Sequence, residues 1–193
     1  MNLNFEWQPF LAPLVERDLF IREGLDRRGI LQDTYHPEME KVHKENAVKL
    51  REAIGLYGFP VLSNAGSKGV ELSWMIIQHS ISLPDFQREC LIQMRLAAAA
   101  DDYPKELLTY TDDCISFFEG RPQLYGTYFD WQDGELKPAA IEDPDHLDAR
   151  RASFGLPPMA ETLAKFVLSK PPKDLEKKKK EFQSWLTSVG WRS

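Results

Sequence analysis

The spacing of apolar residues over the first 119 positions is the feature that most constrains the fold of this chain. Apolar side chains recur there every three or four residues, which is the period of a helix with one buried face. The first such stripe comprises Leu11, Leu14, Val15, Leu19, Phe20 and Leu25. Prolines open several segments, as they can in the first turn of a helix. The pattern predicts helices over residues 9–31, 37–58, 69–83, 84–100 and 105–118, with a turn-rich connection at 61–69.

The pattern changes at Gly120. LYGTYFDW (124–131) and ELKPAAI (135–141) read as strands on either side of Asp133-Gly134, and Asp-Gly between two such runs is a strong hairpin signal. A lone hairpin is marginally stable in water, so it must pack against helices. Two more helical segments follow, at 144–156 and 157–168. The predicted fold class is mainly α with one small β-hairpin, in a single-domain, helical bundle-like (α+β) architecture.

The 193 residues contain no internal repeat and suit one domain with a substantial core. We expect residues 1–169 to form that domain. Residues 170–193 predict a basic amphipathic helix that docks on the body or on a partner, because four lysines at 177–180 precede Phe182, Trp185, Leu186 and Val189.

Charge and composition argue against several classes of partner. The formal net charge is −6 and the pI is near 5.3, which argues against a nucleic acid or an anionic membrane. We interpret the lysine run as a solvated face of a docking helix, with a nucleic-acid or lipid site as the alternative. The first residues lack the basic start and apolar run of a signal peptide, so we expect none. No apolar run approaches the roughly 20 residues of a membrane helix. Two cysteines without metal-ligand spacing favour a reducing cytoplasm.

His79 is the strongest candidate for acid–base chemistry. It ends the apolar segment SWMIIQHS, so Gln78 and His79 bring two hydrogen-bonding side chains close to the core. Trp74 and Glu71 precede it on the same predicted helix. The alternative is a core histidine that only bonds a backbone carbonyl.

The segment HPEMEKVH suggests a metal site as an alternative. His36, Glu40 and His43 stand at i, i+4 and i+7, on one helical face. Two histidines and one carboxylate suit a mononuclear divalent ion. His36 precedes a proline and need not be helical, so a solvated charged helix face is the favoured interpretation.

A polar face on the predicted strand raises a second candidate region. Gln123, Tyr125 and Thr127 would share one face of a strand, with Asp113 nearby in sequence. Gly126 allows close approach of a ligand or backbone. Aromatic residues and threonine are also good strand formers, so the pattern does not separate a pocket wall from a decorated hairpin.

Two arginines follow at Arg150 and Arg151, next to Asp148. Either guanidinium could hold a carboxylate or phosphate of a substrate in a bidentate way. The alternative is a structural ion pair with Asp112 or Asp113. The sequence has no Walker loop, no GxGxxG after a strand and no GxSxG elbow.

Taken in order, several phrases resemble a bacterial family known as a domain of unknown function. They are Asn46 with the following Gly58-Phe59-Pro60, ELSWMIIQH, FQ at 86–87, TDD with EGRPQLYGT, and IEDP with LDARRASFGL. The resemblance covers about residues 42–160 and implies a mostly helical domain with a small hairpin. It also implies a shared role for Gln78, His79, Asp113, Gln123, Tyr125, Gly126, Thr127, Asp143 and Arg151, but no activity.

The chain departs from the family pattern at three positions. His43 stands where aspartate is expected, Cys114 where arginine is expected, and Tyr128 where glutamine is expected. These changes indicate either a specialised member or one that has lost the ancestral activity. His43 also strengthens the metal interpretation.

The leading hypothesis is a small, cofactor-independent enzyme of hydrolase or lyase type that acts on a small polar or anionic substrate. His79 would be the general base, oriented by Asp113 or Glu71, while Tyr125 and Thr127 donate hydrogen bonds to developing negative charge. We expect the substrate to be bound by Trp74, Gln78, Gln123, Arg150 and Arg151.

Two other functions stay open. One is a metal-dependent enzyme in which His43, Glu40 and His79, with Glu71 as a further ligand, hold iron or another divalent ion. The other is a non-enzymatic binding or immunity-type module that uses the acidic surface and the amphipathic tail. The sequence does not indicate an oligomeric state.

Overall fold

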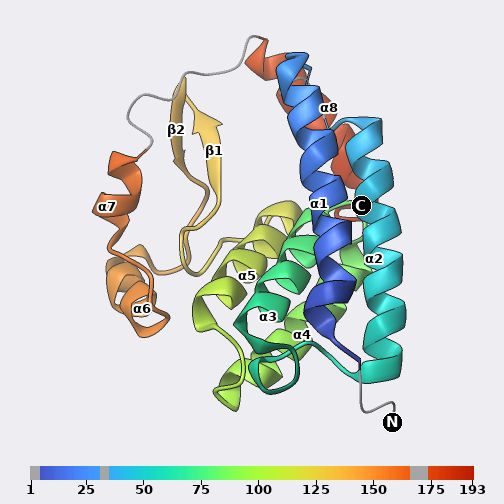
Figure 1. The fold of residues 1–193 in the computed structure, drawn as a ribbon. Helices are drawn as coiled ribbons and strands as arrows, with labels where there is room; N and C mark the ends of the chain where they lie inside the picture. The colour runs from blue at the N-terminus through green and yellow to red at the C-terminus, as the bar shows by residue number, and fades with distance from the viewer. Residues whose placement is uncertain (1–4, 31–34, 166–173) are drawn as a thin grey trace. The chain divides into compact units, whose positions relative to one another are not determined.

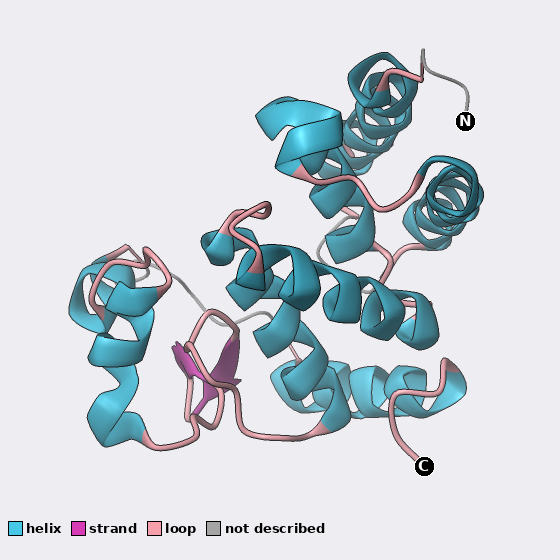
Figure 2. Cartoon of the chain, turned by 90° about the horizontal axis from the view of Figure 1, so that it is seen from below, coloured by secondary structure: helices cyan, strands magenta, loops and turns pink. Residues whose placement is uncertain are grey.

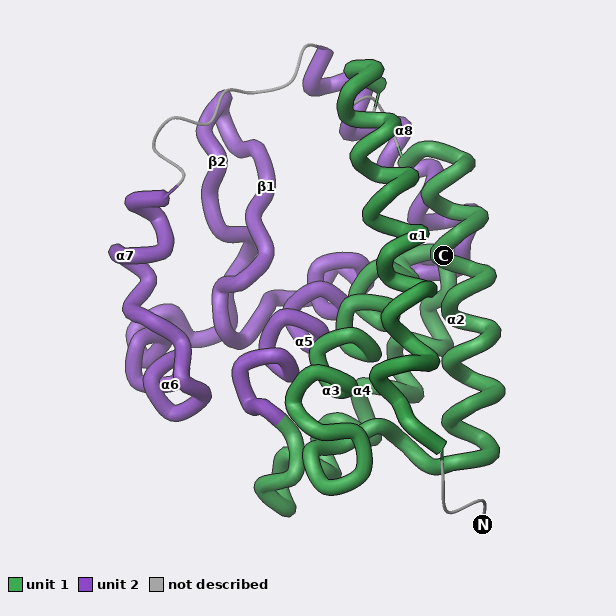
Figure 3. The backbone as a smooth tube through the Cα atoms, in the orientation of Figure 1, with its two compact units in different colours: residues 1–103 green, residues 104–193 purple. Residues whose placement is uncertain are grey.

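The computed structural model describes residues 5–30, 35–165 and 174–193. The chain divides into two compact units, Met1–Tyr103 and Pro104–Ser193 (Figure 3). Helices make up most of the described chain, and one two-stranded sheet accompanies them (Figure 2). The predicted class, mainly α with a small hairpin, is confirmed. Among the described helices, none has both the length and the apolar character needed to span a membrane.

Four helices form the first unit: α1 (Trp7–Arg27), α2 (Pro37–Tyr57), α3 (Leu62–His79) and α4 (Pro84–Ala99) (Figure 1). Helices α1, α2 and α3 contact one another in all three pairings, and α4 contacts α3. Their shared core includes Leu11, Leu25, Val42, Leu50, Ile76 and Ile77, each at most 2% exposed. Burying one such side chain stabilises the fold by about 1.5–3 kcal/mol. This core therefore holds α1, α2 and α3 in fixed positions.

The buried face of α1 differs from the predicted stripe. Leu19 and Phe20 were expected in the core but are 45% and 76% exposed. Asp18 takes the buried position instead and is 1% exposed. In a helix of 3.6 residues per turn, residue 18 lies on the same face as Leu11 and Leu14. Leu19 and Phe20 follow it and turn away from that face.

Helix α3 starts earlier than predicted, within the segment expected to be a connection. Its first residue is Leu62, because the Asn64 side chain accepts a hydrogen bond from the N–H of Val61 at 2.9 Å. The Asp102 carboxylate also accepts hydrogen bonds from the N–H and hydroxyl of Ser63. The turn signal in the sequence reflects Gly66, whose φ of 64° interrupts the helix locally.

The second unit begins with α5 (Lys105–Glu119) and continues with the strands β1 (Phe129–Gln132) and β2 (Glu135–Pro138). The strands pair antiparallel around Asp133-Gly134, as predicted. A short 3₁₀ helix η1 (Pro144–His146), α6 (Leu147–Ser153), α7 (Met159–Ala164) and α8 (Leu175–Ser188) complete it.

Residues 123–127 do not belong to the hairpin strand, which is a correction to the predicted strand over 124–131. Strand β1 begins only at Phe129, and Gln123 makes a single bridge to Ile141. The chain bends at Gly126, where φ is 66°. The alternation argument for a shared face of Gln123, Tyr125 and Thr127 therefore does not apply.

The C-terminal helix α8 packs on α5 within the second unit. Phe118 contacts the rings of Trp185 and Trp191 at centroid distances of 6.0 and 5.1 Å. Arg192 donates hydrogen bonds to the carbonyls of Phe117 and Phe118 at the end of α5. These contacts pack α8 and the residues after it on the end of α5. The predicted boundary at residues 169–170 lies outside the described residues.

Candidate functional site

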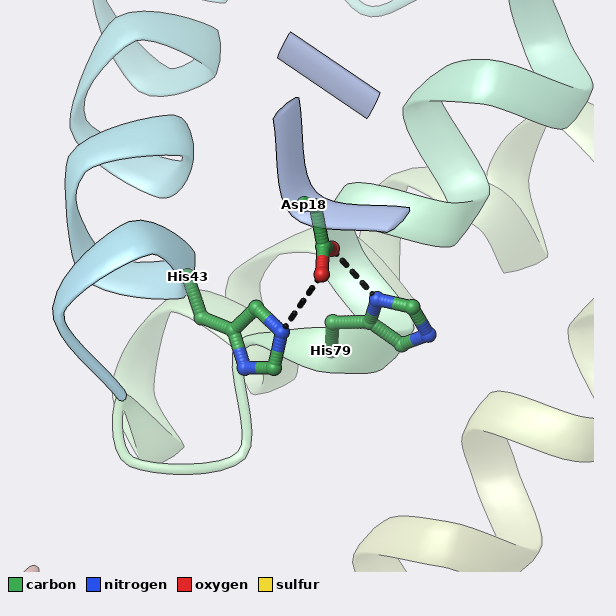
Figure 4. Close-up of side chains that lie close together, drawn as sticks. All are labelled: Asp18, His43 and His79. Carbon is green, nitrogen blue, oxygen red and sulfur yellow. Dashed lines mark hydrogen bonds and ion pairs between the residues drawn. The ribbon is translucent and has the colours of Figure 1, made fainter. Parts of the chain in front are cut away.

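Asp18, His43 and His79 form a cluster where the three mutually packed helices of the first unit meet (Figure 4). Asp18 projects from α1, His43 from α2, and His79 is the last residue of α3. Their side chains are 1%, 6% and 25% exposed. One ligand atom from each lies within 4.8 Å of the others, and the described residues contain no other such group of three.

The carboxylate of Asp18 joins the two imidazole rings. Its Oδ1 lies 3.1 Å from Nε2 of His43, and its Oδ2 lies 2.7 Å from Nδ1 of His79. The two ring centroids are 5.0 Å apart. Each carboxylate oxygen therefore accepts a hydrogen bond from a different histidine, as Figure 4 shows.

The negative charge of Asp18 determines which nitrogens of His43 and His79 carry a hydrogen. Burial disfavours the charged carboxylate, but the hydrogen bonds and electrostatic attraction of His43 and His79 outweigh it and hold the pKa of Asp18 well below its usual 3.8. A charged carboxylate only accepts hydrogen bonds, so Nε2 of His43 and Nδ1 of His79 carry the hydrogens. In the neutral rings, Nδ1 of His43 and Nε2 of His79 keep their lone pairs.

Tyr35 completes the hydrogen bonding of His43. Its hydroxyl lies 2.7 Å from Nδ1 of His43, and the two rings stack at 5.7 Å. Burial raises the pKa of Tyr35 above its usual value, so the hydroxyl stays protonated and donates a hydrogen bond to Nδ1 of His43. No described residue hydrogen-bonds Nε2 of His79. That atom, on a partly exposed ring, is the one ring nitrogen of the cluster that is open to a ligand.

The end of α3 is held in place from α4. Nε2 of Gln87, a fully buried side chain, donates to the carbonyls of Ile77 and Gln78 at 2.7 and 3.2 Å. The Ser80 hydroxyl donates to the carbonyl of Ile76 at 2.6 Å. Carbonyls at a helix end lack intrahelical partners. These bonds satisfy them and fix the turn that carries His79.

The carboxylate beside His79 was not predicted. The expected orienting groups were Asp113 and Glu71, but Glu71 pairs with Lys68 at 3.0 Å and Nδ1 of His79 contacts Asp18. An aspartate at a buried position of an apolar helical stripe is the sequence signal that would have pointed to Asp18, because such a carboxylate needs a buried partner.

The predicted metal ligands are only partly brought together. His43 lies beside His79 as the metal hypothesis expected, but the carboxylate next to them belongs to Asp18, and Glu40 pairs with Lys44 at 2.6 Å. His36 caps α2, since its Nδ1 accepts the N–H of Glu38 at 3.2 Å. The predicted binding residues Trp74 and Gln78 are half-buried on the last turns of α3.

Asp113 lies in the second unit, where its carboxylate organises a loop. It accepts hydrogen bonds from the N–H groups of Leu124, Tyr125 and Thr127 at 2.8, 3.0 and 2.8 Å, and from the Thr127 hydroxyl at 2.9 Å. Burial raises the pKa of Asp113, and these hydrogen bonds oppose the rise. Asp113 is fully buried, so its contacts are those of a structural carboxylate.

Gln123 closes the same loop from the other side. Its amide donates to the carbonyls of Tyr128 and Ala139, and its oxygen accepts the N–H of Tyr128 at 2.9 Å. Gln123 is fully buried, and Tyr125 is 6% exposed and packs on the ring of Phe154. Gln123 therefore fixes the shape of the loop over residues 123–128 from inside the protein.

The two arginines bind backbone carbonyls of the same unit. Arg151, 2% exposed, donates to the carbonyls of Pro157 and Tyr125 and to the Thr162 hydroxyl. Arg150 donates to the carbonyls of Leu124, Glu142 and Asp143. Each nitrogen of the Arg151 guanidinium thus has a partner inside the protein.

A cavity of about 1060 Å³ also lies in the second unit, along β2. Hairpin residues, Pro144 and Leu163 line it. Its charged lining residues Glu135 and Lys137 pair with each other at 2.7 Å, and none of the described residues that line it is a histidine. We therefore place the candidate chemistry at the Asp18 cluster.

Fold and site together define a mainly helical protein with a buried carboxylate that bridges two histidines. The model of a family of unknown function, DUF6624, matches residues 7–168, and the chain belongs to this family. The sequence-based assignment to a family of unknown function is confirmed. Comparison with curated proteins and with solved structures gave no match.

Proposed function

We propose that the protein is an enzyme of hydrolase or lyase type in which His79 is the general base for a small polar substrate. One observation carries the proposal: Nδ1 of His79 is bound to a buried carboxylate at 2.7 Å, and Nε2 has no partner among the described residues. This arrangement of base and orienting carboxylate supports proton abstraction in many enzymes.

The proton pathway follows from the hydrogen bonds. Nε2 of His79 accepts a proton from a bound water or substrate, and the ring becomes a cation. The adjacent charge of Asp18 stabilises that cation strongly, because the carboxylate is buried away from water. Nε2 then returns the proton to the leaving group, so the base is regenerated without a cofactor.

His43 and Tyr35 have supporting roles in this proposal. The bond from His43 to Oδ1 holds the carboxylate so that Oδ2 faces His79. Tyr35 keeps His43 in the tautomer that makes this bond. Both are positioning residues, because neither provides the atom that receives the proton.

The second unit enters the proposal as a structural element. Asp113, Gln123 and Arg151 use their polar atoms to shape the 123–128 loop. Arg151 was expected to bind an anionic group of the substrate, but its guanidinium is already hydrogen-bonded inside the protein. We therefore propose a small polar substrate without that anionic group.

The tautomers of the histidines provide a direct test. In long-range ¹H–¹⁵N spectra of metal-free protein at neutral pH, we expect His79 to carry its proton on Nδ1 and His43 on Nε2. A His79 ring protonated on Nε2 alone would contradict the proposal, since the exposed nitrogen would then be no base.

Activity is tested with a panel of small polar esters, amides, phosphate esters and hydroxy acids. His79→Gln should lower any activity found by roughly 10²–10⁴-fold. His146→Gln is the matched control, because His146 is 74% exposed and contacts Asp143 in the second unit. Full activity in folded His79→Gln protein would rule out the assigned base.

A further inference from the structure

We propose that Asp18, His43 and His79 are also the protein ligands of a divalent metal ion of the zinc or iron(II) type. The three side chains place one carboxylate oxygen and two imidazole nitrogens within 4.8 Å of one another. Imidazole and carboxylate are the donors that such ions prefer, and small adjustments of the rings would bring the atoms to coordination distance.

The three donor side chains are held in the protein as a metal site requires, and they do not form an ordinary ion pair on the surface. Each donor comes from a different helix, and the three helices pack on one another, so the donors are held before any ion arrives. Asp18 and His43 are 1% and 6% exposed, whereas His79 is 25% exposed. The buried Asp18 and His43 would hold the ion on its inner side. Its coordination would be open beside the partly exposed His79, where water or another ligand completes it.

Tyr35 provides the outer support that metal-binding histidines require. A ligating imidazole usually donates its other N–H to a neighbouring oxygen, which fixes the ring. The Tyr35 hydroxyl lies 2.7 Å from Nδ1 of His43. This hydroxyl can donate to Nδ1 in the metal-free cluster and accept from Nδ1–H once Nε2 is a ligand.

Metal binding and the proposed base are mutually exclusive. Nε2 of His43 and Nδ1 of His79, the atoms that face Asp18, carry hydrogens in the metal-free cluster. To bind the ion they must offer lone pairs, so the hydrogens move to Nδ1 of His43 and Nε2 of His79 with no net loss of protons. Nε2 of His79 then becomes a donor and cannot accept a proton. The ion therefore switches off the base, a consequence that depends on the proposed function, whereas the binding does not.

Zinc binding to the full-length chain tests the site. The protein is treated with chelator, desalted and titrated with Zn²⁺ by calorimetry. We expect one ion per chain, and at least a tenfold loss of affinity in His79→Gln and in His43→Gln. Tyr35→Phe should lose roughly tenfold, as for other residues that support a ligand. His146→Gln should bind like the wild type.

The outcomes separate the two proposals. Wild type that binds no Zn²⁺, or folded His79→Gln that binds with unchanged affinity, would overturn the metal site while leaving the base intact. His79→Gln is the deciding variant because its partly exposed side chain is the least needed for folding, which circular dichroism verifies. In ¹⁵N spectra, Zn²⁺ should move the His79 hydrogen to Nε2. Spectra that keep it on Nδ1 at saturating Zn²⁺ would show that the ion binds elsewhere.

Discussion

Oδ2 of Asp18 lies 2.7 Å from Nδ1 of His79, although 61 positions separate the two residues in the sequence. The contact connects the middle of α1 to the last residue of α3. It fixes the ring of His79 by one nitrogen and leaves the other without a partner among the described residues. This single relationship underlies both the proposed base and the proposed metal site.

Asp18→Asn should lower the free energy of unfolding by about 2 kcal/mol at pH 7, the usual scale for hydrogen bonds to a charged group. The amide that replaces the carboxylate can accept from only one of the two histidines. Asp85→Asn is the matched control, because its carboxylate is 85% exposed and pairs with Arg88 one turn further along the same helix. Urea unfolding in the presence of a chelator measures both, and equal losses would show that the cluster adds no stability.

Asp113→Asn should loosen the loop at 123–128 and cost about 2–3 kcal/mol. The amide keeps only one acceptor oxygen, and its NH2 group would face N–H donors that bonded the other carboxylate oxygen. Thr127→Val, which removes only one donor, should cost about 1 kcal/mol. Hydrogen exchange should show faster exchange at the amides of Leu124, Tyr125 and Thr127. Unchanged exchange together with lost activity would instead place Asp113 in the chemistry.

Gly126→Ala should destabilise the second unit by about 1–3 kcal/mol. The residue has a φ of 66°, and an added Cβ would overlap the Met159 side chain and lie 3.3 Å from Ile141. Gly134→Ala measures the cost of the left-handed backbone alone, because Gly134 has a φ of 80° and an added Cβ would have no atom within 4 Å. Thermal unfolding should rank Gly126→Ala as the less stable. The reverse order would mean that Met159 moves aside at no cost.

Tyr103→Phe should change how stability depends on alkaline pH. Burial raises the pKa of Tyr103 above its usual 10.0 in the folded protein, so the unfolded chain ionises first. The stability of the wild type is therefore unaffected well below pH 10 and falls as the pH rises above it. Between pH 8 and 10.5, the wild type should lose about 0.8 kcal/mol more than Tyr103→Phe.

Urea unfolding at the two pH values measures this difference. At pH 8 the variant should be at least as stable as the wild type, because the Tyr103 hydroxyl is buried without a hydrogen-bond partner among the described residues. An equal loss in both proteins at pH 10.5 would mean that Tyr103 ionises as easily in the folded state as in the unfolded one.

The helices and the hairpin could be predicted because their signals are local. Apolar spacing identified the segments that became α2, α4 and α5, and Asp133-Gly134 marked the turn between β1 and β2. Local signals failed at residues 123–127. There the Asp113 carboxylate, 11 to 14 positions away, binds backbone N–H groups that a strand would have used. Residues 123–127 are of types that favour a strand, but their hydrogen bonds to Asp113 hold them in a loop.

For the site, the sequence by itself indicated that His79 would lie near the core, because it ends an apolar helical segment. The favoured interpretation of the His43 face as solvated was wrong, since the His43 side chain is only 6% exposed. The sequence did not determine the partner of either histidine. Asp18 is 25 positions from His43 and 61 from His79, and only the packing of α1 between the other two helices brings its carboxylate to both rings. Periodicity selects which face of a helix is buried. Which polar groups then meet depends on how the buried faces pack, and that is decided by the tertiary structure.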